Sequence, residues 1–400
     1  MSTSATKHHD VDIHDEVFLA SRYDAFAQLR SACPVAHSNS HGGYWLLTRQ
    51  ADVRAAALDW RTYTSAVPGV TANPIITQRT TPQLPIELDP PQHSRYRALV
   101  NPVFTPERVE AVRPQIGRLA RTLLDSIARQ GKAELVADLC VPIAINSLAA
   151  FTDLPLQDSH LWIAWVQRMF NVHDRDDGAI ATKEMGAYVD TLISERRRAP
   201  AGDFLSMLMA VEVDGHRLDD SQIHSFVTVL FGAGFETTAD SLSIMLLWLF
   251  EHPGDVARLT ADPALLPTAV EEFLRYASPI QVFGRNTTRD VVLHGCTIPK
   301  GDIVGLAFGS ANHDADAFPE PDRVQLDRTP NRHLTFGAGP HLCAGAGVAR
   351  MEMAVLLAAL IEAEIGFQFD PGRPVEWKTR GDRNGLARLP VVVERSDMRS

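Results

Sequence analysis

Ten residues near the C-terminal end, Phe336–Gly345, place a single cysteine among glycines. Cys343 follows Gly337 and Gly339 and precedes Gly345. Glycine allows a backbone to turn tightly and to approach a bound group closely. The pattern predicts a helix soon after this loop. Because the free N–H groups at a helix N-terminus stabilise negative charge, this setting favours a thiolate over a thiol.

The chemistry of Cys343 has three interpretations when this stretch is taken alone. The cysteine is buried in a structural turn, or it is a nucleophile that needs histidine and amide or carboxylate partners elsewhere in the chain. In the third interpretation, its thiolate is a ligand to haem iron. The other cysteines, Cys33, Cys140 and Cys296, are far apart in sequence and form no CxxC pair. This spacing predicts reduced, mostly buried thiols.

A second group of residues lies in the middle of a predicted helix, where 233–238 has the sequence Ala-Gly-Phe-Glu-Thr-Thr. Glycine is costly inside a helix, yet Gly232 and Gly234 occur close together. A threonine hydroxyl can bond to the carbonyl one turn earlier and bend a helix. Taken alone, the stretch indicates either close packing of helices at small residues or a local distortion that makes room for a ligand.

Two charged pairs occur at helical spacing. Glu272 and Arg275 are three residues apart, and His93 and Arg97 are four apart, so each pair shares a helix face. The usual outcome of such spacing is a solvated surface pair that contributes little to stability. A functional role for either pair therefore needs support from the rest of the chain.

The elements that must position these residues are predicted from apolar periodicity and from capping and breaking residues. Helices are predicted for residues 23–31, 93–103, 106–130, 141–151, 159–170, 179–198, 222–252 and 270–276, with a last helix ending near 364. Strands are predicted for residues 44–48, 291–293, 303–306 and 389–394. Residues 66–92 are rich in proline, threonine and glycine and are predicted to form a long loop. The predicted fold class is mainly α with a small β portion.

Composition limits the class of protein. The chain has 400 residues, 45% of them hydrophobic and 22% charged, as in an ordinary globular protein. Its net charge of −11 argues against nucleic acid as the main partner. No apolar run is long enough to span a bilayer, and the polar N-terminus lacks the core of a signal peptide. We therefore expect a cytoplasmic protein with no membrane or nucleic-acid partner, in which a polar tail (1–20) precedes one domain (21–396).

The stretch around Cys343 resembles the haem-binding loop of cytochromes P450, which has the form Phe-x-x-Gly-x-x-x-Cys-x-Gly. Phe336, Gly339, Cys343 and Gly345 fill its fixed positions, and His341 fits the bacterial variant. The resemblance implies that Cys343 is the thiolate ligand to the iron of haem b.

The helical stretch also resembles a part of this family, the oxygen-binding groove of the central helix. The resemblance implies that Ala233 and Gly234 make room for O2 above the iron. It implies that Thr237 hydrogen-bonds the bound oxygen and that Glu236 helps to relay protons. Such chemistry needs positioned proton donors, because cleavage of the O–O bond consumes protons.

The charged pairs match two further features of the family. Glu272 and Arg275 match a buried structural Glu-x-x-Arg pair, and Arg323 is the expected third member, because buried charges need full pairing. Two propionates of haem need charge-assisted donors. The residues that match the family's propionate donors are His93, Arg97, Arg285 and His341.

The resemblance implies the cytochrome P450 fold, a single triangular domain with haem between the long central helix and the helix after Cys343. It implies a soluble bacterial-type haem-thiolate monooxygenase that inserts one atom of O2 into a small or medium lipophilic substrate, for example an aromatic or terpenoid compound. Electrons would come from NAD(P)H through a ferredoxin and its reductase. Arginines expected to form the docking patch for this partner are Arg95, Arg108, Arg332 and Arg350. Apolar residues expected at the substrate, which could equally belong to the core, are Phe231, Phe235, Ile280, Val282 and Phe283.

Two other activities stay open. A peroxide-using P450 would need no electron partner, and a haem-thiolate sensor or carrier would bind haem without turnover. Both replace or dispense with the acid–alcohol pair, and Glu236 and Thr237 are both present. The sequence therefore favours the monooxygenase.

Overall fold

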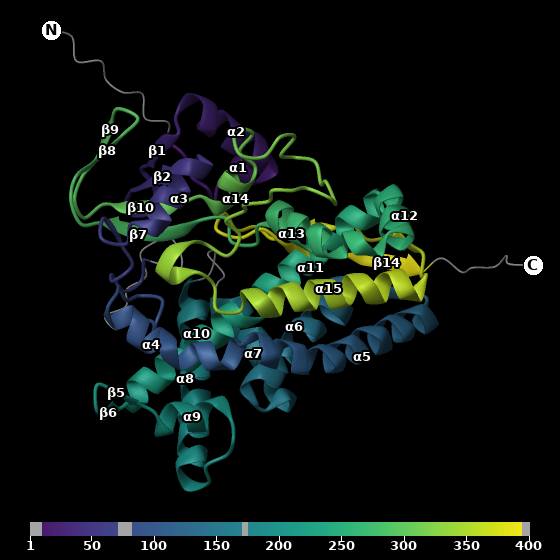
Figure 1. Ribbon diagram of the computed structural model, residues 1–400, viewed down its shortest axis with the longest axis horizontal. Coiled ribbons are helices and arrows are strands. Elements are labelled where there is room, and N and C mark those ends of the chain that lie inside the picture. Colours follow the sequence, from purple (N-terminus) through teal and green to yellow (C-terminus); the bar gives the residue numbers. More distant parts are fainter. Residues whose placement is uncertain (1–9, 71–81, 170–174, 394–400) are drawn as a thin grey trace, which may run out of the picture. The chain divides into compact units, whose positions relative to one another are not determined.

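The computed structural model describes residues 10–70, 82–169 and 175–393, drawn as ribbons in Figure 1. The described chain divides into two compact units, each assembled from several segments. The first comprises residues 10–70, 82–94, 271–343 and 378–384, and the second comprises 95–169, 175–270, 344–377 and 385–393. Two helices run from one unit into the other along the chain, α4 (Gln92–Val100) and α13 (Leu266–Ala277).

A five-stranded sheet with the strand order β1-β2-β10-β7-β3 organises the first unit. Its strands are β1 (Val35–Ser38), β2 (Tyr44–Leu47), β3 (Tyr63–Thr64), β7 (Phe283–Thr287) and β10 (Ile303–Leu306). Strands β2 and β10 are parallel, and the other neighbours are antiparallel. The unit also contains α1 (Glu16–Ala20), α2 (Arg22–Ala32), α3 (Gln50–Leu58), α14 (Phe308–Asn312) and a hairpin of β8 (Val291–Leu293) and β9 (Cys296–Ile298).

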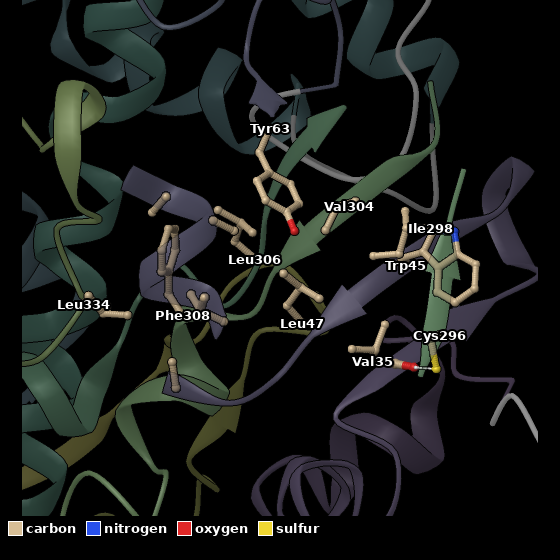
Figure 2. Close-up of a cluster of buried hydrophobic side chains, with 14 residues drawn as sticks. Val35, Trp45, Leu47, Tyr63, Cys296, Ile298, Val304, Leu306, Phe308 and Leu334 are labelled. Atoms are coloured by element: carbon tan, nitrogen blue, oxygen red, sulfur yellow. Dashed lines mark hydrogen bonds between the residues drawn. The ribbon is translucent and has the colours of Figure 1, made fainter. Parts of the chain in front are cut away.

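Strand β2 shows why this sheet forms where it does. Successive side chains of a strand point to opposite faces. Trp45 and Leu47 join the buried cluster on one face, together with Val304 of β10 (Figure 2). Tyr44 and Leu46 join a second buried cluster on the other face. Both faces are covered, so the strand is a continuous apolar run rather than an alternating one.

The second unit is mainly helical. Its helices are α5 (Pro106–Gln130), α6 (Val141–Thr152), α7 (Ser159–Met169), α8 (Arg175–Arg198), α9 (Phe204–Ala210), α10 (Asp220–Gly234), α11 (Glu236–Glu251), α12 (Pro253–Ala261) and α15 (Ala346–Ala363). A three-stranded sheet is formed by β4 (Lys132–Glu134), β11 (Phe367–Phe369) and β14 (Pro390–Val393). Two short hairpins pair β5 (Glu212–Val213) with β6 (His216–Arg217) and β12 (Glu376–Trp377) with β13 (Leu386–Arg388).

Helix α5 illustrates how local signals set the bounds of these helices. The Thr105 side chain accepts a hydrogen bond from the Arg108 N–H at the start, and Gly131 ends the helix with a φ of 74°. A hydroxyl at the N-cap and a left-handed glycine after the last turn are common helix boundaries. Helix α5 lies alongside α15, and both run lengthwise through the lower half of Figure 1.

The predicted fold class, mainly α with a small β portion, is confirmed. The helices predicted at 106–130 and 141–151 correspond to α5 and α6 almost residue for residue, and the strands predicted at 44–48 and 303–306 correspond to β2 and β10. Within the described part of the predicted loop, 66–70 and 82–91, there is no helix or strand. The predicted helix end at Phe170 and strand end at Glu394 lie outside the described residues. None of the described helices combines the length and apolar character needed to cross a membrane.

One prediction about the central helix is wrong. Residues 222–252 form two helices, α10 and α11, that are interrupted at Phe235, where φ is −132°. The start agrees better, because Asp219 caps α10 through a reciprocal pair of hydrogen bonds with Gln222. The interruption falls within the Gly- and Thr-containing stretch that the sequence singled out.

Candidate active site

The loop that carries Cys343 is closed by a hydrogen bond from the Cys343 N–H to the Phe336 carbonyl oxygen, at 3.0 Å. Gly337 and Gly339 have φ values of 72° and 70°, a left-handed conformation that side chains disfavour. A Cβ on Gly339 would also lie 2.9 Å from the Ala57 carbonyl oxygen in α3. Glycine is therefore favoured at position 337 by its φ and required at position 339 by both its φ and this close contact. The result is an exposed Cys343.

Cys343 differs in this exposure from the other cysteines, since Cys33, Cys140 and Cys296 are all buried. The structure therefore removes the interpretation of Cys343 as a buried thiol in a structural turn. Gly345 is the N-cap residue of α15, and a Cβ there would meet no described protein atom within 4 Å. Protein packing does not demand glycine at position 345, whereas close approach of a bound group would.

Three of the four predicted propionate donors belong to the first unit, and two of them touch. The rings of His93 and His341 have centroids 4.3 Å apart. Arg285, on β7, is 4% exposed and donates to the Gly284 carbonyl oxygen at 2.7 Å. Burial lowers the pKa of Arg285 to about 10, an effect that nearby Asp89 partly offsets. A desolvated guanidinium and two adjoining imidazoles suit a ligand that carries carboxylates.

The fourth predicted donor, Arg97, lies one turn after His93 on α4 and is partly exposed. Its Nε donates to the Asn101 side chain at 2.9 Å. Arg97 belongs to the second unit, unlike the other three predicted donors. Its role as a propionate donor remains a prediction.

Two contacts lie at the interruption of the central helix. The Thr237 hydroxyl donates to the Ala233 carbonyl oxygen at 3.2 Å, one turn earlier. Such a bond often bends a helix, but Thr122 makes the same bond within the unbroken α5, so it does not by itself explain the break. Gly234 packs closely against α6, because a Cβ there would lie 2.8 Å from a methyl carbon of Leu148. Close packing, which the sequence left open, thus holds at Gly234, whereas Ala233 is exposed.

The two residues of the predicted acid–alcohol pair, Glu236 and Thr237, are adjacent in sequence but differ in their exposure to solvent. Glu236 is the first residue of α11 and is 6% exposed, whereas Thr237 is partly exposed. The structure brings both residues to the break between α10 and α11. Their roles in proton transfer remain predictions.

A second buried carboxyl group, which the sequence did not reveal, lies on α15. Glu352 is 1% exposed, and burial raises its pKa to about 8. The hydroxyls of Ser147 on α6 and Thr238 on α11 act in the opposite direction and lower its pKa by less. The available signal was a charged residue directly between Met351 and Met353 in a largely apolar helix. At neutral pH, this environment favours the protonated form of Glu352.

The structural pair predicted in the first unit is present and fully buried. Glu272 and Arg275 are both 0% exposed and make two hydrogen bonds of 2.8 Å. The predicted third member is wrong. The side chain of Arg323 is 70% exposed and faces Glu320 at 3.8 Å. Instead, Arg328 donates from its Nε to both Glu272 oxygens, at 2.9 and 3.0 Å.

There is a physical reason why the side chain of Arg328, and not that of Arg323, pairs with Glu272. The Arg323 carbonyl oxygen accepts hydrogen bonds from Arg275 and Arg328, so the backbone, not the side chain, of this residue joins the network. The two arginines are five residues apart, and only the path of the chain decides which guanidinium reaches Glu272. A carboxylate held by two buried guanidiniums keeps a lowered pKa despite desolvation.

The residues predicted at the substrate divide between core and partly exposed positions. Phe231, Phe235 and Val282 are at most 2% exposed, and Phe231 stacks on Trp162 at 4.8 Å. Ile280 and Phe283 are only partly buried and pack against the cluster in Figure 2. Phe231 and Phe235 belong to the second unit and the other three to the first.

The arginines predicted at the docking patch have partners of their own in two cases. Arg95 forms an ion pair with Asp214, and Arg108 donates to the Phe151 carbonyl oxygen at 3.2 Å. Arg332, in the first unit, is exposed. The docking patch remains a prediction.

Comparisons with known proteins agree with the resemblance seen in the sequence. The family model described as cytochrome P450 matches residues 159–391. The vitamin D(3) 25-hydroxylase of Pseudonocardia autotrophica is 34% identical over 401 residues, covering 98% of each chain. The solved structure of cytochrome P450 CYP109Q5 from Chondromyces apiculatus is 31% identical with a TM-score of 0.84, covering 96% of this chain and 98% of that one. The structure of CYP109E1 from Bacillus megaterium with testosterone is 29% identical with a TM-score of 0.84, covering 93% and 97%.

Proposed function

Because this chain belongs to the cytochrome P450 family of monooxygenases, we propose that it inserts one oxygen atom of O2 into a small or medium lipophilic substrate. The observation that carries this proposal is the exposed Cys343 at the end of a loop that two left-handed glycines shape. A thiolate in such a loop is suited to ligate haem iron. Electrons would come from NAD(P)H through a separate ferredoxin and its reductase.

The residues of the first unit fit haem b. Cys343 would be the ligand to its iron, and Arg285, His93 and His341 would bind its propionates. A buried Arg285 with a lowered pKa gains most from a carboxylate, because an opposite charge restores what desolvation removes. Haem with a thiolate ligand supplies the activation of O2 when it is bound.

The residues at the break in the central helix would hold and move protons. Ala233 is exposed, which leaves space beside the helix for a small ligand. To donate to a bound oxygen atom, the Thr237 hydroxyl would turn from the Ala233 carbonyl oxygen, its acceptor in this structure. The Glu236 carboxyl group, adjacent in sequence, would resupply the proton. General acid catalysis of this kind requires a donor within hydrogen-bond reach of the acceptor.

The substrate is proposed to be lipophilic, for example an aromatic or terpenoid compound. Partly buried Ile280 and Phe283 support an apolar contact surface in the first unit. The relatives named above include a vitamin D(3) hydroxylase and a protein solved with testosterone, and both of those ligands are lipophilic. A screen that follows the spin-state change of ferric haem across a lipophilic library would identify compounds that bind.

The test of haem-thiolate ligation is the substitution Cys343→Ser, with Cys140→Ser as the matched control. Cys140 is buried in the second unit. We expect Cys343→Ser to lose the red-shifted absorption of the ferrous–CO complex that thiolate ligation gives, and Cys140→Ser to keep it. If the red-shifted band survived in Cys343→Ser, the assigned ligand would be wrong.

The monooxygenase is separated from its alternatives by electron use. The reconstituted protein with ferredoxin and reductase should consume NAD(P)H and form product only when substrate is present. Product formation from peroxide alone at an equal rate would favour a peroxide-using P450. Haem binding without any turnover would favour a sensor or carrier.

A further inference from the structure

Two cysteines that are distant in sequence converge on one backbone oxygen in the first unit. The Cys33 thiol donates to the Val35 carbonyl oxygen at 3.4 Å, and the Cys296 thiol donates to the same oxygen at 4.0 Å. Figure 2 shows the second of these contacts. The two sulfur atoms are therefore separated by no more than the sum of these distances.

Three elements bring the thiols together. Cys33 is the C-cap residue of α2, Val35 is the first residue of β1, and Cys296 is the first residue of β9. Both sulfurs contact the same oxygen, and rotation about each Cα–Cβ bond can change the distance between the two sulfurs. Cys33 and Cys296 are 9% and 8% exposed, respectively, whereas Cys140 is 0% exposed. The pair is thus shielded but less completely enclosed than Cys140.

We propose that Cys33 and Cys296 are an oxidisable thiol pair, which peroxide converts into a disulfide joining the end of α2 to the β8–β9 hairpin. One thiolate attacks a peroxide oxygen, the O–O bond breaks, and a sulfenic acid and one water form. The second thiol then attacks the sulfenic sulfur, forming the S–S bond and releasing a second water. Together the two thiols lose two electrons and two protons. These reduce one molecule of peroxide to two molecules of water.

The surroundings of the pair set the pH dependence of this reaction. Burial raises the pKa of Cys296, and neighbouring Cys33 raises it further. The thiolate is the nucleophile, so a raised pKa makes oxidation slow at neutral pH. The rate of cross-linking should therefore increase with pH between 7 and 9.

The test uses the full-length haem-loaded protein, treated in parallel with hydrogen peroxide and with diamide, a thiol-specific oxidant. Free thiols are then alkylated, and the protein is digested with trypsin without reduction and analysed by mass spectrometry. We expect residues 31–49 to be linked to residues 290–300, each peptide carrying one cysteine. The link should vanish on treatment with dithiothreitol and should form faster at pH 9 than at pH 7. The disulfide should also raise the thermal midpoint, because it closes a long loop.

The matched variants are Cys33→Ser, which should abolish the cross-link, and Cys140→Ser, which should leave its yield unchanged. If Cys33→Ser does not fold, the alkylation pattern of the unsubstituted protein still decides. Recovery of Cys33 and Cys296 in singly alkylated form, while Cys343 is oxidised, would overturn the proposal. A cross-link that contains Cys343 would overturn it too, because Cys33 and Cys296 would then not be paired with each other.

Discussion

Replacing the buried Glu352 with glutamine should stabilise this protein at neutral pH. The side chain is 1% exposed, and its pKa is raised from 4.5 to about 8 because burial disfavours the carboxylate. In the unfolded chain the same group loses its proton near pH 4.5, so between pH 4.5 and 8 the folded state binds the extra proton. The contribution of Glu352 to the free energy of unfolding is therefore fully present below pH 4.5 and is lost as the pH rises toward 8.

The magnitude follows from the two pKa values. Each unit of pKa difference corresponds to about 1.4 kcal/mol, so at pH 7 the ionisable Glu352 costs roughly 3 kcal/mol relative to a neutral isostere. For a chain of this length, an unfolding entropy of about 2.1 cal/mol/K per residue converts that energy into a thermal midpoint higher by about 4 °C. This increase in the thermal midpoint of Glu352→Gln should shrink to zero near pH 4.5.

The assay is the thermal midpoint of the haem-loaded protein by circular dichroism at one scan rate, from pH 5 to pH 8. Glu352→Gln is compared with Glu362→Gln, a substitution on the same helix at a side chain that is 62% exposed. The control removes a carboxyl group from the same helix without changing the buried site, so it should leave the pH dependence as in the unsubstituted protein. A difference between Glu352→Gln and the unsubstituted protein that is constant across this range would refute the assignment of a buried, protonated carboxyl group.

Three further predictions concern the site and its support. Thr237→Ala should lower the rate of product formation by about 10²-fold while NAD(P)H consumption continues and more peroxide is released, and unchanged coupling would contradict the proton-donor role. Arg328→Ala should destabilise the protein by about 3–5 kcal/mol because it removes one partner of a buried carboxylate, whereas Arg323→Ala should stay within about 0.5 kcal/mol, measured by urea unfolding. Gly339→Ala should reduce haem content, because residue 339 has a positive φ and its Cβ would contact a backbone oxygen. Gly345→Ala should retain the protein fold, as judged by circular dichroism. Equal loss of secondary structure in both variants would contradict this distinction.

Features that depend on residues close in sequence were predictable. The bounds of α5 follow from a threonine cap and a terminal glycine, and the loop at Cys343 follows from glycines within six residues of it. The contact between Glu272 and Arg275 follows from their i,i+3 spacing. In each case, backbone conformation or helix geometry fixes the relation, whatever the rest of the chain does.

Features that depend on distant segments were decided only by the tertiary structure. Arg328 rather than Arg323 reaches Glu272, and the path of the folded chain alone decides between these two arginines. In the sequence, Glu352 is one of a few charged residues in a largely apolar helix, and only its burial in the folded protein raises its pKa. The burial and proton affinity of a side chain depend on the neighbours that the fold assembles around it. The sequence therefore identified residues of this site but not the environment in which they act.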